Sequence, residues 1–461
     1  SAQAYSTYRD TNSVNRYSTK IVYVDQIFDE FSYGMPTPLA IKRFCKMAMD
    51  VWGTKPKYFF LWGKAVLTPR IPNGAKVFTW GYPATDFEFV ANFDPNVRSY
   101  VPLVPIGRIN VRSDADGFAY LEKIRQYEHT AFQPWMKKGI HLGGGNRADE
   151  QSGIRYCLET LCEPIFEGAP LGGDIFYHQK NTTNTVSSNV GNQIRQIISD
   201  GVSIVNFFGH SAATIYDVEI ETPDAYSNWG KYPFMIANGC YSGDFVSSYT
   251  FGEKFINEPN RGTIGYLSSS STGYLTPLTR YNQILYKKAF GDSLAIALGE
   301  IIRRVHLHSL YNNPAADPYS INHVRQINLQ CDPSLSLYAP RNPDLEITEA
   351  GISFEPNDFS AQSDSFQVVV IAKNLGSAFP DSFALQIKQT VLSSGQTIIH
   401  PLRKYAPVLS QDTLRFTIYR SNADIAGLNT FDIFIDAEEI LAENREDNNR
   451  VILQNLVPAK V

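Results

Sequence analysis

Two segments of the sequence indicate how the chain folds, VSIVNFFGH at Val202–His210 and YPFMIANGC at Tyr232–Cys240. Each is an apolar run of the length of a buried strand, and each stops at a side chain that can take part in nucleophilic chemistry. The chain between them leaves room for a crossover, as neighbouring parallel strands require. In an open parallel sheet, ligands and catalytic groups gather at the carboxyl ends of the strands. We therefore expect His210 and Cys240 to face one another at that edge.

Strand-like and helix-like segments alternate along about the first 340 residues, which predicts an α/β fold, a parallel sheet with helices on both faces. The predicted strands are Lys20–Val24, Lys57–Gly63, Ile140–Gly145, Val202–His210, Tyr232–Cys240 and Gly262–Ser270. The predicted helices are Thr37–Trp52, Phe118–His129, Asn192–Gly201 and Ser248–Asn257. A break near Gln133–Trp135 divides this region into a first subdomain over residues 1–135 and a second over residues 136–340.

Residues 341–461 have a different character. Short runs of alternating apolar and polar residues are separated by turn residues such as Gly376 and Gly427. This pattern predicts an all-β module, an antiparallel sandwich of about one hundred residues. Pro340 and Pro343 mark the linker that precedes it.

Composition bounds the class of protein. The chain has 461 residues, 43% of them hydrophobic and 19% charged, which suits a globular protein of two or three domains. A net charge of -5 offers no electrostatic basis for binding nucleic acid, and no apolar run approaches the length of about 20 residues that crosses a bilayer. The 5 cysteines are an odd, scattered set, so they predict neither a disulfide framework nor a zinc site. The polar N-terminus lacks a signal pattern, so we expect a processed chain.

A thiol and an imidazole together can carry out nucleophilic catalysis. The ordinary pKa of a thiol is about 8.5, so a nearby imidazole must take its proton for rapid attack at neutral pH. Either residue alone is more often a packed core group, but their placement in glycine-rich turns at one sheet edge favours the catalytic interpretation. The small residues that would let a substrate approach and aim N–H groups at an oxyanion are Gly209, Ser211, Ala212, Gly239, Ser242 and Gly243.

These segments resemble the gingipain family of cysteine peptidases, in which one strand ends in Gly-His-Gly and a later strand ends in Cys, followed by Gly-Asp-Phe. FGHSAATIY at 208–216 and ANGCYSGDF at 237–245 carry the likeness. Further stretches, from Val24–Phe44 to INLQCDPSLSLY at 327–338, extend it over about residues 1–340. The family includes the gingipains and the sortase of the type IX secretion system. The resemblance implies a caspase-like fold and a thioester on Cys240, with His210 as the general base.

Other site residues follow from the same resemblance. Backbone N–H groups near Ser211 and Gly239 would bind the oxyanion, and Ser211 stands where the family has glycine. An upstream acid would orient His210, and the candidates are Asp149 and Glu150. The segment after the third strand shapes the substrate pocket in the resembled fold, which assigns to the pocket wall Ser268, Ser269, Ser270 and Tyr274.

The resemblance also implies export and retention at the surface of a Gram-negative bacterium of the Bacteroidetes type. The expected partners are a polypeptide substrate and other secretion or surface proteins, with no nucleic acid and no membrane span. Whether water or an amine resolves the thioester, which separates a peptidase from a transpeptidase, stays open. So does the alternative of a catalytically impaired scaffold or adhesion module in a secretion or gliding machinery. The family pattern has a strand before the segment that opens this chain, so the first subdomain is expected to lack it.

The C-terminal region carries a resemblance of its own. PDLEITEAGISFEP at 343–356 and VVVIAKNLGSAF at 368–379 resemble the immunoglobulin-like domains attached to bacterial secreted proteins. The late turn ENREDNN brings together Glu443, Glu446 and Asp447, a candidate site for a structural calcium ion. A solvated turn without a metal explains the same residues, because Asp and Asn in turns bond their own backbone. The chemistry itself requires no cofactor.

Overall fold

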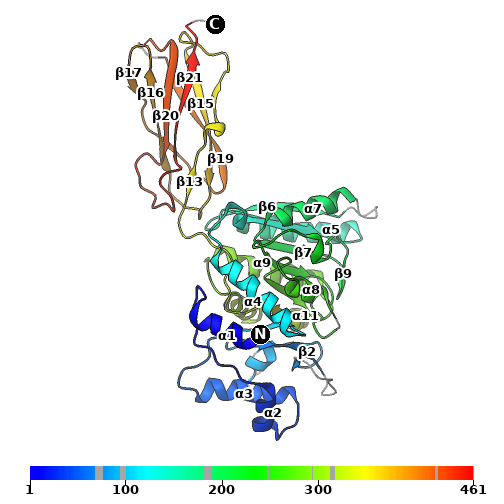
Figure 1. Cartoon of the computed structure of the whole chain (residues 1–461). Coiled ribbons are helices and arrows are strands. Elements are labelled where there is room, and N and C mark those ends of the chain that lie inside the picture. Colours follow the sequence, from blue (N-terminus) through cyan, green and yellow to red (C-terminus); the bar gives the residue numbers. More distant parts are fainter. Residues whose placement is uncertain are drawn as a thin grey trace. The chain divides into compact units, whose positions relative to one another are not determined.

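The computed structural model describes residues 1–67, 76–93, 100–180, 188–247, 249–292, 294–311, 317–420 and 424–459 (Figure 1). The chain forms two compact units. The α/β unit comprises Ser1–Ile165 and Ile175–Tyr338, and the β unit comprises Phe166–Asp174 and Ala339–Val461. The division of the first 340 residues near residue 135 stays a prediction.

The α/β unit is built on a six-stranded sheet with the strand order β12-β11-β10-β7-β5-β6. Its strands are β5 (Lys138–Gly143), β6 (Asp174–Gln179), β7 (Ile204–Phe208), β10 (Phe234–Asn238), β11 (Gly265–Ser269) and β12 (Ile327–Gln330). β5, β7, β10 and β11 run parallel, and β12 is antiparallel to β11. All residues of β7, β10 and β11 are buried, as expected of strands covered on both faces. The predicted parallel sheet is confirmed.

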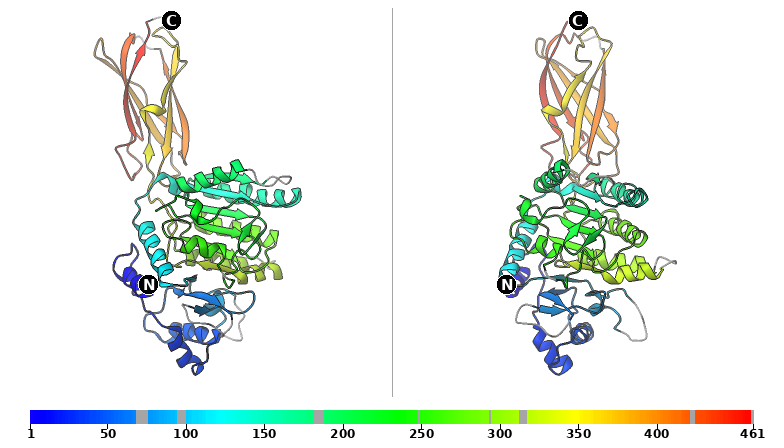
Figure 2. Two further views of the ribbon diagram at one scale, coloured as in Figure 1. Left: turned by 45° about the vertical axis from the view of Figure 1, so that its right-hand side comes forward. Right: turned by 90° about the vertical axis from the view of Figure 1, so that its right-hand side faces the viewer.

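Helices cover both faces of this sheet, as the two views of Figure 2 show. α4 (Asp114–His129) packs with α8 (Phe251–Asn257), while α9 (Leu275–Tyr286) packs with α5 (Ala148–Arg155) and α10 (Leu298–Tyr311). Local sequence sets these boundaries: Ser113 caps α4 by accepting the N–H of Asp116 at 3.3 Å, and Asp116 accepts the N–H of Ser113 at 3.2 Å. The other helical segments are η3 (Tyr156–Cys162), α6 (Glu163–Glu167), α7 (Ser188–Asp200), η4 (Pro223–Ala225), η5 (Lys287–Gly291) and α11 (Pro318–Gln326).

The N-terminal part of the α/β unit contains two small parallel sheets. β1 (Phe59–Trp62) pairs with β4 (Ile106–Ile109), and β2 (Lys64–Val66) pairs with β3 (Lys76–Phe78). The helices of this part are α1 (Ala2–Thr11), α2 (Val24–Ser32), α3 (Pro38–Val51), η1 (Phe87–Val90) and η2 (Pro134–Lys137). The predicted helix at Thr37–Trp52 is confirmed by α3, where the Thr37 hydroxyl accepts the Leu39 N–H at 3.4 Å.

The strand predicted at Lys20–Val24 is wrong. The segment before Val24 has no regular structure, and α2 begins at Val24. The sequence after the apolar run explains the difference. Asp25 lies in the first turn, where a negative charge favours a helix N-terminus, and the Gln26 side chain accepts the Tyr23 N–H at 3.3 Å. These start signals outweigh the β propensity of the valines and the tyrosine that precede them.

A buried ion pair ties β2 to the segment that follows Cys240. The Lys64 ammonium donates to the backbone oxygens of Phe245 and Ser247 at 2.7 and 2.6 Å, and it forms an ion pair with Glu253 of α8. Burial lowers the pKa of Lys64 and raises that of Glu253, so desolvation outweighs their mutual attraction in both groups. Lys64 therefore holds the segment at Phe245–Ser247, which follows the candidate nucleophile, against β2 and α8.

The β unit is an antiparallel sandwich, as the alternating pattern predicts. One sheet contains β13 (Leu345–Glu346), β14 (Ile352–Glu355), β15 (Ser365–Asn374) and β19 (Gln411–Tyr419). The other contains β16 (Phe383–Val391), β17 (Gln396–Ile399), β18 (Arg403–Tyr405), β20 (Gly427–Ile435) and β21 (Arg450–Val457). A short turn, η6 (Glu349–Gly351), precedes β14. The two sheets share one apolar core, which includes Val368, Val370, Leu385, Ile387, Phe416, Phe431 and Ile433.

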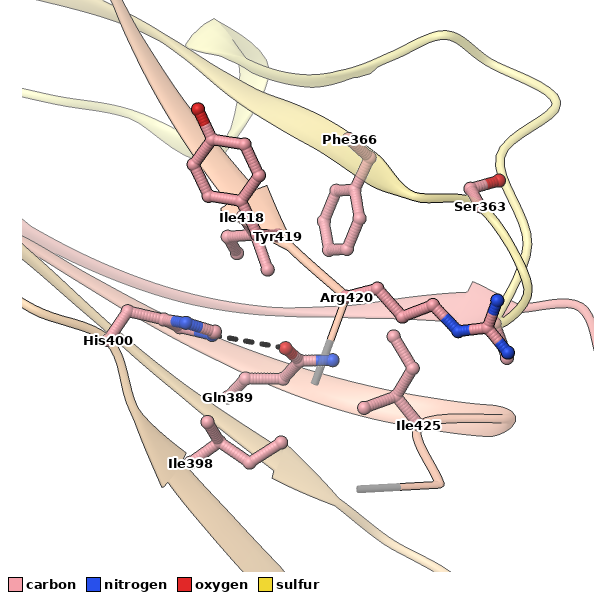
Figure 3. Close-up of a pocket in the computed structure, with 10 residues that line it drawn as sticks. Ser363, Phe366, Gln389, Ile398, His400, Ile418, Tyr419, Arg420 and Ile425 are labelled. Atoms are coloured by element: carbon pink, nitrogen blue, oxygen red, sulfur yellow. Dashed lines mark hydrogen bonds between the residues drawn. The ribbon is translucent and has the colours of Figure 1, made fainter. Parts of the chain in front are cut away.

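A small pocket opens within the β unit (Figure 3). Figure 3 shows His400 beside Gln389, with the His400 Nε2 atom 3.2 Å from the Gln389 Oε1 atom. Burial lowers the pKa of His400, so the imidazole is neutral at physiological pH. The cavity volume is about 10 Å³, which is the space for a single water molecule. The pocket is therefore too small for a peptide or a cofactor.

In the turn at residues 443–449 of the β unit, the glutamate carboxylates accept hydrogen bonds from nearby residues. Glu443 accepts the N–H of Leu345 and, at 3.3 Å, the side-chain amide of Asn449, while Glu446 accepts the Glu443 N–H at 3.1 Å. Within the described ranges, no group of three or more His, Cys, Asp and Glu side chains is arranged to hold a metal ion. The calcium site therefore stays a prediction. In the same described ranges, no helix combines the length and the apolar character that crossing a bilayer demands.

Candidate active site

The strands β7 and β10 bring His210 and Cys240 to the same edge of the sheet. Phe208 of β7 pairs with Asn238 of β10. His210 and Cys240 each follow their member of this residue pair by two positions. Two hydrogen bonds join the turns that follow. The Gly209 N–H donates to the Asn238 oxygen at 3.1 Å, and the Ser211 hydroxyl donates to the Cys240 oxygen at 2.9 Å. These hydrogen bonds join the turns that contain His210 and Cys240 at the carboxyl ends of neighbouring parallel strands.

Glu150 lies beside the imidazole of His210. Its Oε2 atom is 3.2 Å from the His210 Nε2 atom and accepts the Asn146 N–H at 3.1 Å. These contacts, the Asn146 N–H above all, hold the pKa of Glu150 below its usual value. The other candidate acid, Asp149, instead forms an exposed ion pair with Arg147, with an Nε–Oδ1 distance of 2.9 Å. Of the two adjacent carboxylates, the structure therefore places Glu150 at the ring.

The His210 ring keeps a nitrogen available for a proton transfer. Glu150 engages Nε2, and Nδ1 has no hydrogen bond within the described part of the chain. The side chain is about half exposed, at 51%. An imidazole held at one nitrogen by a carboxylate, with the other nitrogen open, has the arrangement of an oriented general base.

Cys240 is the one partly exposed cysteine, since the other four are buried. Its sulfur accepts the Gly273 N–H at 3.4 Å and lies 3.6 Å from the Gly273 oxygen. No hydrogen bond joins this sulfur to the His210 ring within the described residues. The next residue, Tyr241, has φ 54°, which is an uncommon conformation for a non-glycine residue, directly after the candidate nucleophile. Burial raises the pKa of the other thiols for which a shift is resolved, Cys45, Cys162 and Cys331.

Ser211 and Gly239, the predicted oxyanion residues, lie against each other. A Cβ atom at Gly239 would lie 2.0 Å from the Ser211 Oγ atom, so glycine at 239 makes the space that the hydroxyl occupies. Ser211 begins β8 (Ser211–Ala212), which pairs with β9 (Ile215–Tyr216), and its φ is not positive. Serine therefore fits without backbone strain at the position where the family has glycine. Whether these two residues bind an oxyanion stays a prediction.

The predicted pocket residues differ in their surroundings. Ser268, Ser269 and Ser270 are buried. The Ser269 hydroxyl donates to the Ser271 oxygen at 3.2 Å, the Ser270 hydroxyl donates to the Ala84 oxygen at 2.6 Å, and the Ser268 hydroxyl faces Gly243. Tyr274 is 53% exposed and follows Gly273, the residue that contacts the Cys240 sulfur. Their assignment to the pocket wall stays a prediction.

Asp217 also reaches this edge, and the sequence analysis missed it. Its carboxylate accepts the N–H of His210 at 3.1 Å and that of Gly145 at 2.8 Å. The family resemblance points to an acid upstream of the histidine, whereas Asp217 follows the histidine by seven positions. A short hairpin, β8–β9, returns it to the histidine. In the sequence, a single aspartate after a short turn gives no sign that it contacts the histidine.

Comparison with known proteins gives a family and a fold. The model of peptidase family C25 matches residues 1–338. The solved complex of Porphyromonas gingivalis RgpB pro- and mature domains is similar at 16% identity over 99% of this chain and 97% of that chain, with a TM-score of 0.57. The crystal structure of the Arg-specific cysteine proteinase gingipain R (RGPB) matches at 17% identity over 99% of this chain and 94% of that chain, with a TM-score of 0.55. At these identities the likeness is one of fold. No curated protein matches the sequence.

Proposed function

The chain belongs to peptidase family C25, and from this membership we propose that it is an exported cysteine peptidase in which Cys240 is the nucleophile and His210 the general base. One observation carries the assignment of these residues. The partly exposed Cys240 and His210 each lie two positions beyond the paired residues Asn238 and Phe208 of neighbouring strands, and Glu150 contacts the His210 ring. Export to the cell surface rests on the family resemblance set out above.

The proposed reaction begins with proton transfer from the Cys240 thiol to His210 Nδ1. The thiolate then attacks the carbonyl carbon of a peptide bond, and the carbonyl oxygen becomes an oxyanion near the backbone N–H groups at Ser211 and Gly239. Collapse of this intermediate forms a thioester on Cys240 and breaks the C–N bond, and the imidazolium gives its proton to the leaving amine. Glu150 stabilises the imidazolium while it exists.

Water or an amine then attacks the thioester, with His210 again accepting a proton. Water completes hydrolysis and restores the thiol, whereas an amine forms a new amide bond, as in a transpeptidase. In free enzymes the hydrogen bonds of a catalytic pair are often long and tighten only with substrate bound. The separated sulfur and ring of this structure are compatible with that behaviour.

The proposal is tested by incubating denatured casein with the wild-type chain and with Cys240→Ala. The wild type is expected to generate new peptide N-termini, identified by mass spectrometry, and the variant to generate none. A glycine-peptide amine added to the reaction becomes attached to product C-termini only if transpeptidation takes place. Cleavage that persists in Cys240→Ala, with its fold verified by circular dichroism, contradicts the assignment. A wild-type chain that neither cleaves casein nor attaches the amine supports the impaired-scaffold alternative.

A further inference from the structure

Asp217 grips the backbone of His210 from both sides. Its Oδ1 atom accepts the His210 N–H at 3.1 Å, and its own N–H donates to the His210 oxygen at 3.0 Å. Its Oδ2 atom accepts the N–H of Gly145 at 2.8 Å, on the loop after β5. The carboxylate is 12% exposed, so it joins two loops at the sheet edge in a site largely shielded from water. Hydrogen bonds to an ionised carboxylate are roughly twice as strong as those between neutral groups.

The glycines around Asp217 keep space for this carboxylate. A Cβ atom on Gly144 would lie 2.1 Å from the Asp217 Oδ1 atom, and one on Gly209 would lie 2.4 Å from the same atom. A third glycine, Gly143, would place a Cβ atom 2.4 Å from the Oε1 atom of Gln179. The segment HLGGGN therefore has a structural explanation: its glycines admit the side chains that hold the loop.

Lys180 compensates the charge of Asp217. Its ammonium lies 3.6 Å from the Asp217 Oδ2 atom and donates to the Asn146 side-chain oxygen at 2.8 Å. The Lys180 backbone N–H donates to the Gly143 oxygen at 2.8 Å, and the Gln179 amide donates to the oxygens of Gly143 and Gly144 at 3.1 and 2.6 Å. The loop is thus braced by the end of β6 and by Asp217 together.

The braced loop also positions Glu150. The Asn146 N–H donates to the Glu150 oxygen that contacts the His210 ring. Asp217 consequently holds the backbone of His210, and Glu150 holds its ring. The neighbouring residues Gly145 and Asn146 donate their N–H groups to Asp217 and Glu150, respectively. We infer that Asp217 is a positioning residue that sets His210 for proton transfer with Cys240. This inference rests on the proposed function of His210 as the general base.

The inference is tested with Asp217→Asn beside the control Glu219→Gln, which removes one negative charge two residues away. The readouts are the rate of Cys240 alkylation by iodoacetamide at pH 6.5, and kcat and KM for a fluorogenic peptide copied from a casein site that the wild type cleaves. Asp217→Asn is expected to lower kcat about 10- to 100-fold, since small misplacements of catalytic groups cost that much. KM should stay within about twofold and the alkylation rate should fall with kcat, because the Asp217 carboxylate is largely buried and bonds the backbone of His210 and Gly145.

A second variant guards against misfolding of the first. Gly144→Ala keeps the Asp217 charge but puts a methyl group where the carboxylate lies, so it is expected to lower kcat in the same way. The inference is overturned if Asp217→Asn folds and has the same kcat and alkylation rate as Glu219→Gln. If Asp217→Asn does not fold, the same comparison is made with Gly144→Ala. In that case Cys240-dependent cleavage by the wild type still stands. Loss of the proposed function shows itself differently, as a wild type whose cleavage does not depend on Cys240.

Discussion

Glu150 and Asp149 show how far sequence reasoning reaches at the scale of one residue. Both carboxylates were candidates, because they are adjacent and both precede the histidine. Helix phase and one neighbour separate them: Arg147 takes Asp149 into an exposed pair, and Glu150 turns to the His210 ring. Neither the phase of a short helix nor the choice of a salt-bridge partner can be read from composition or spacing. Asp217 was hidden for a related reason, since only the β8–β9 hairpin returns it to the histidine.

Glu150→Gln should slow the enzyme without unfolding it. The amide oxygen can still accept the hydrogen bonds of the Asn146 N–H and the His210 ring, but it no longer stabilises the imidazolium by charge. We expect kcat to fall at least about tenfold, which is less than the about 100- to 10,000-fold that a positioned acid–base group itself contributes. The matched control is Asp149→Asn, whose parent carboxylate pairs with Arg147. Equal kcat values for the two variants would contradict the role assigned to Glu150.

Three buried histidines should make the α/β unit sensitive to acid. Burial lowers the pKa of His141 and His306 to about 3 and that of His323 to about 4, from an ordinary value of 6.5. As the pH falls below 6.5, these histidines bind protons in the unfolded chain but stay neutral in the folded chain. Stability is therefore lost from pH 6.5 down to about pH 3. The free energy of unfolding should drop by about 2 kcal/mol per histidine between pH 6.5 and pH 5.

Urea unfolding of the α/β unit at pH 7 and pH 5 measures this drop. His323→Gln should reduce the pH dependence by about one third, because it removes one of the three buried imidazoles. A free energy that is equal at both pH values would show that these imidazoles are not buried in their neutral form.

At the scale of elements, the strands that carry the site were predictable and some of the framework was not. β7 and β10 are buried on both faces, so each reads as one continuous apolar run whose end is visible in the sequence. The run Lys20–Val24 has the same appearance but lacks a strand partner, and the helix start signals of Asp25 and Gln26 prevail. Pairing partners far apart in the chain, such as those of β1 and β4, leave no local signal.

The buried pair Lys64–Glu253 links β2 to α8 and should be sensitive to the loss of one member. The side chains are 10% and 0% exposed, so Lys64→Met leaves a carboxylate buried without its cation. We expect this single variant to lose about 3–5 kcal/mol in urea unfolding. The double variant Lys64→Met/Glu253→Leu should recover most of the loss, because desolvation opposes the pair in both groups. A single variant that loses less than about 1 kcal/mol would contradict this account, since it would match an exposed ion pair.

At the scale of the whole molecule, the chain has two compact units with separate apolar cores. Calorimetry should therefore resolve two unfolding transitions. Phe431 is fully buried in the core of the β unit, and Phe431→Ala should destabilise that unit by about 3–5 kcal/mol. One transition should move to lower temperature and the other should stay in place. A single transition that shifts as a whole would show that the two units unfold cooperatively.

The central claim is that Cys240 and His210 act as one catalytic pair, and the reactivity of the thiol tests it most directly. The measurement is the rate of iodoacetamide alkylation at each of the 5 cysteines at pH 6.5, followed by peptide mapping in the wild type and in His210→Ala. If the two residues act as a pair, Cys240 should react at least about tenfold faster than a free cysteine peptide, and His210→Ala should remove this advantage. A Cys240 that reacts no faster than the peptide, or equally fast without His210, would contradict it.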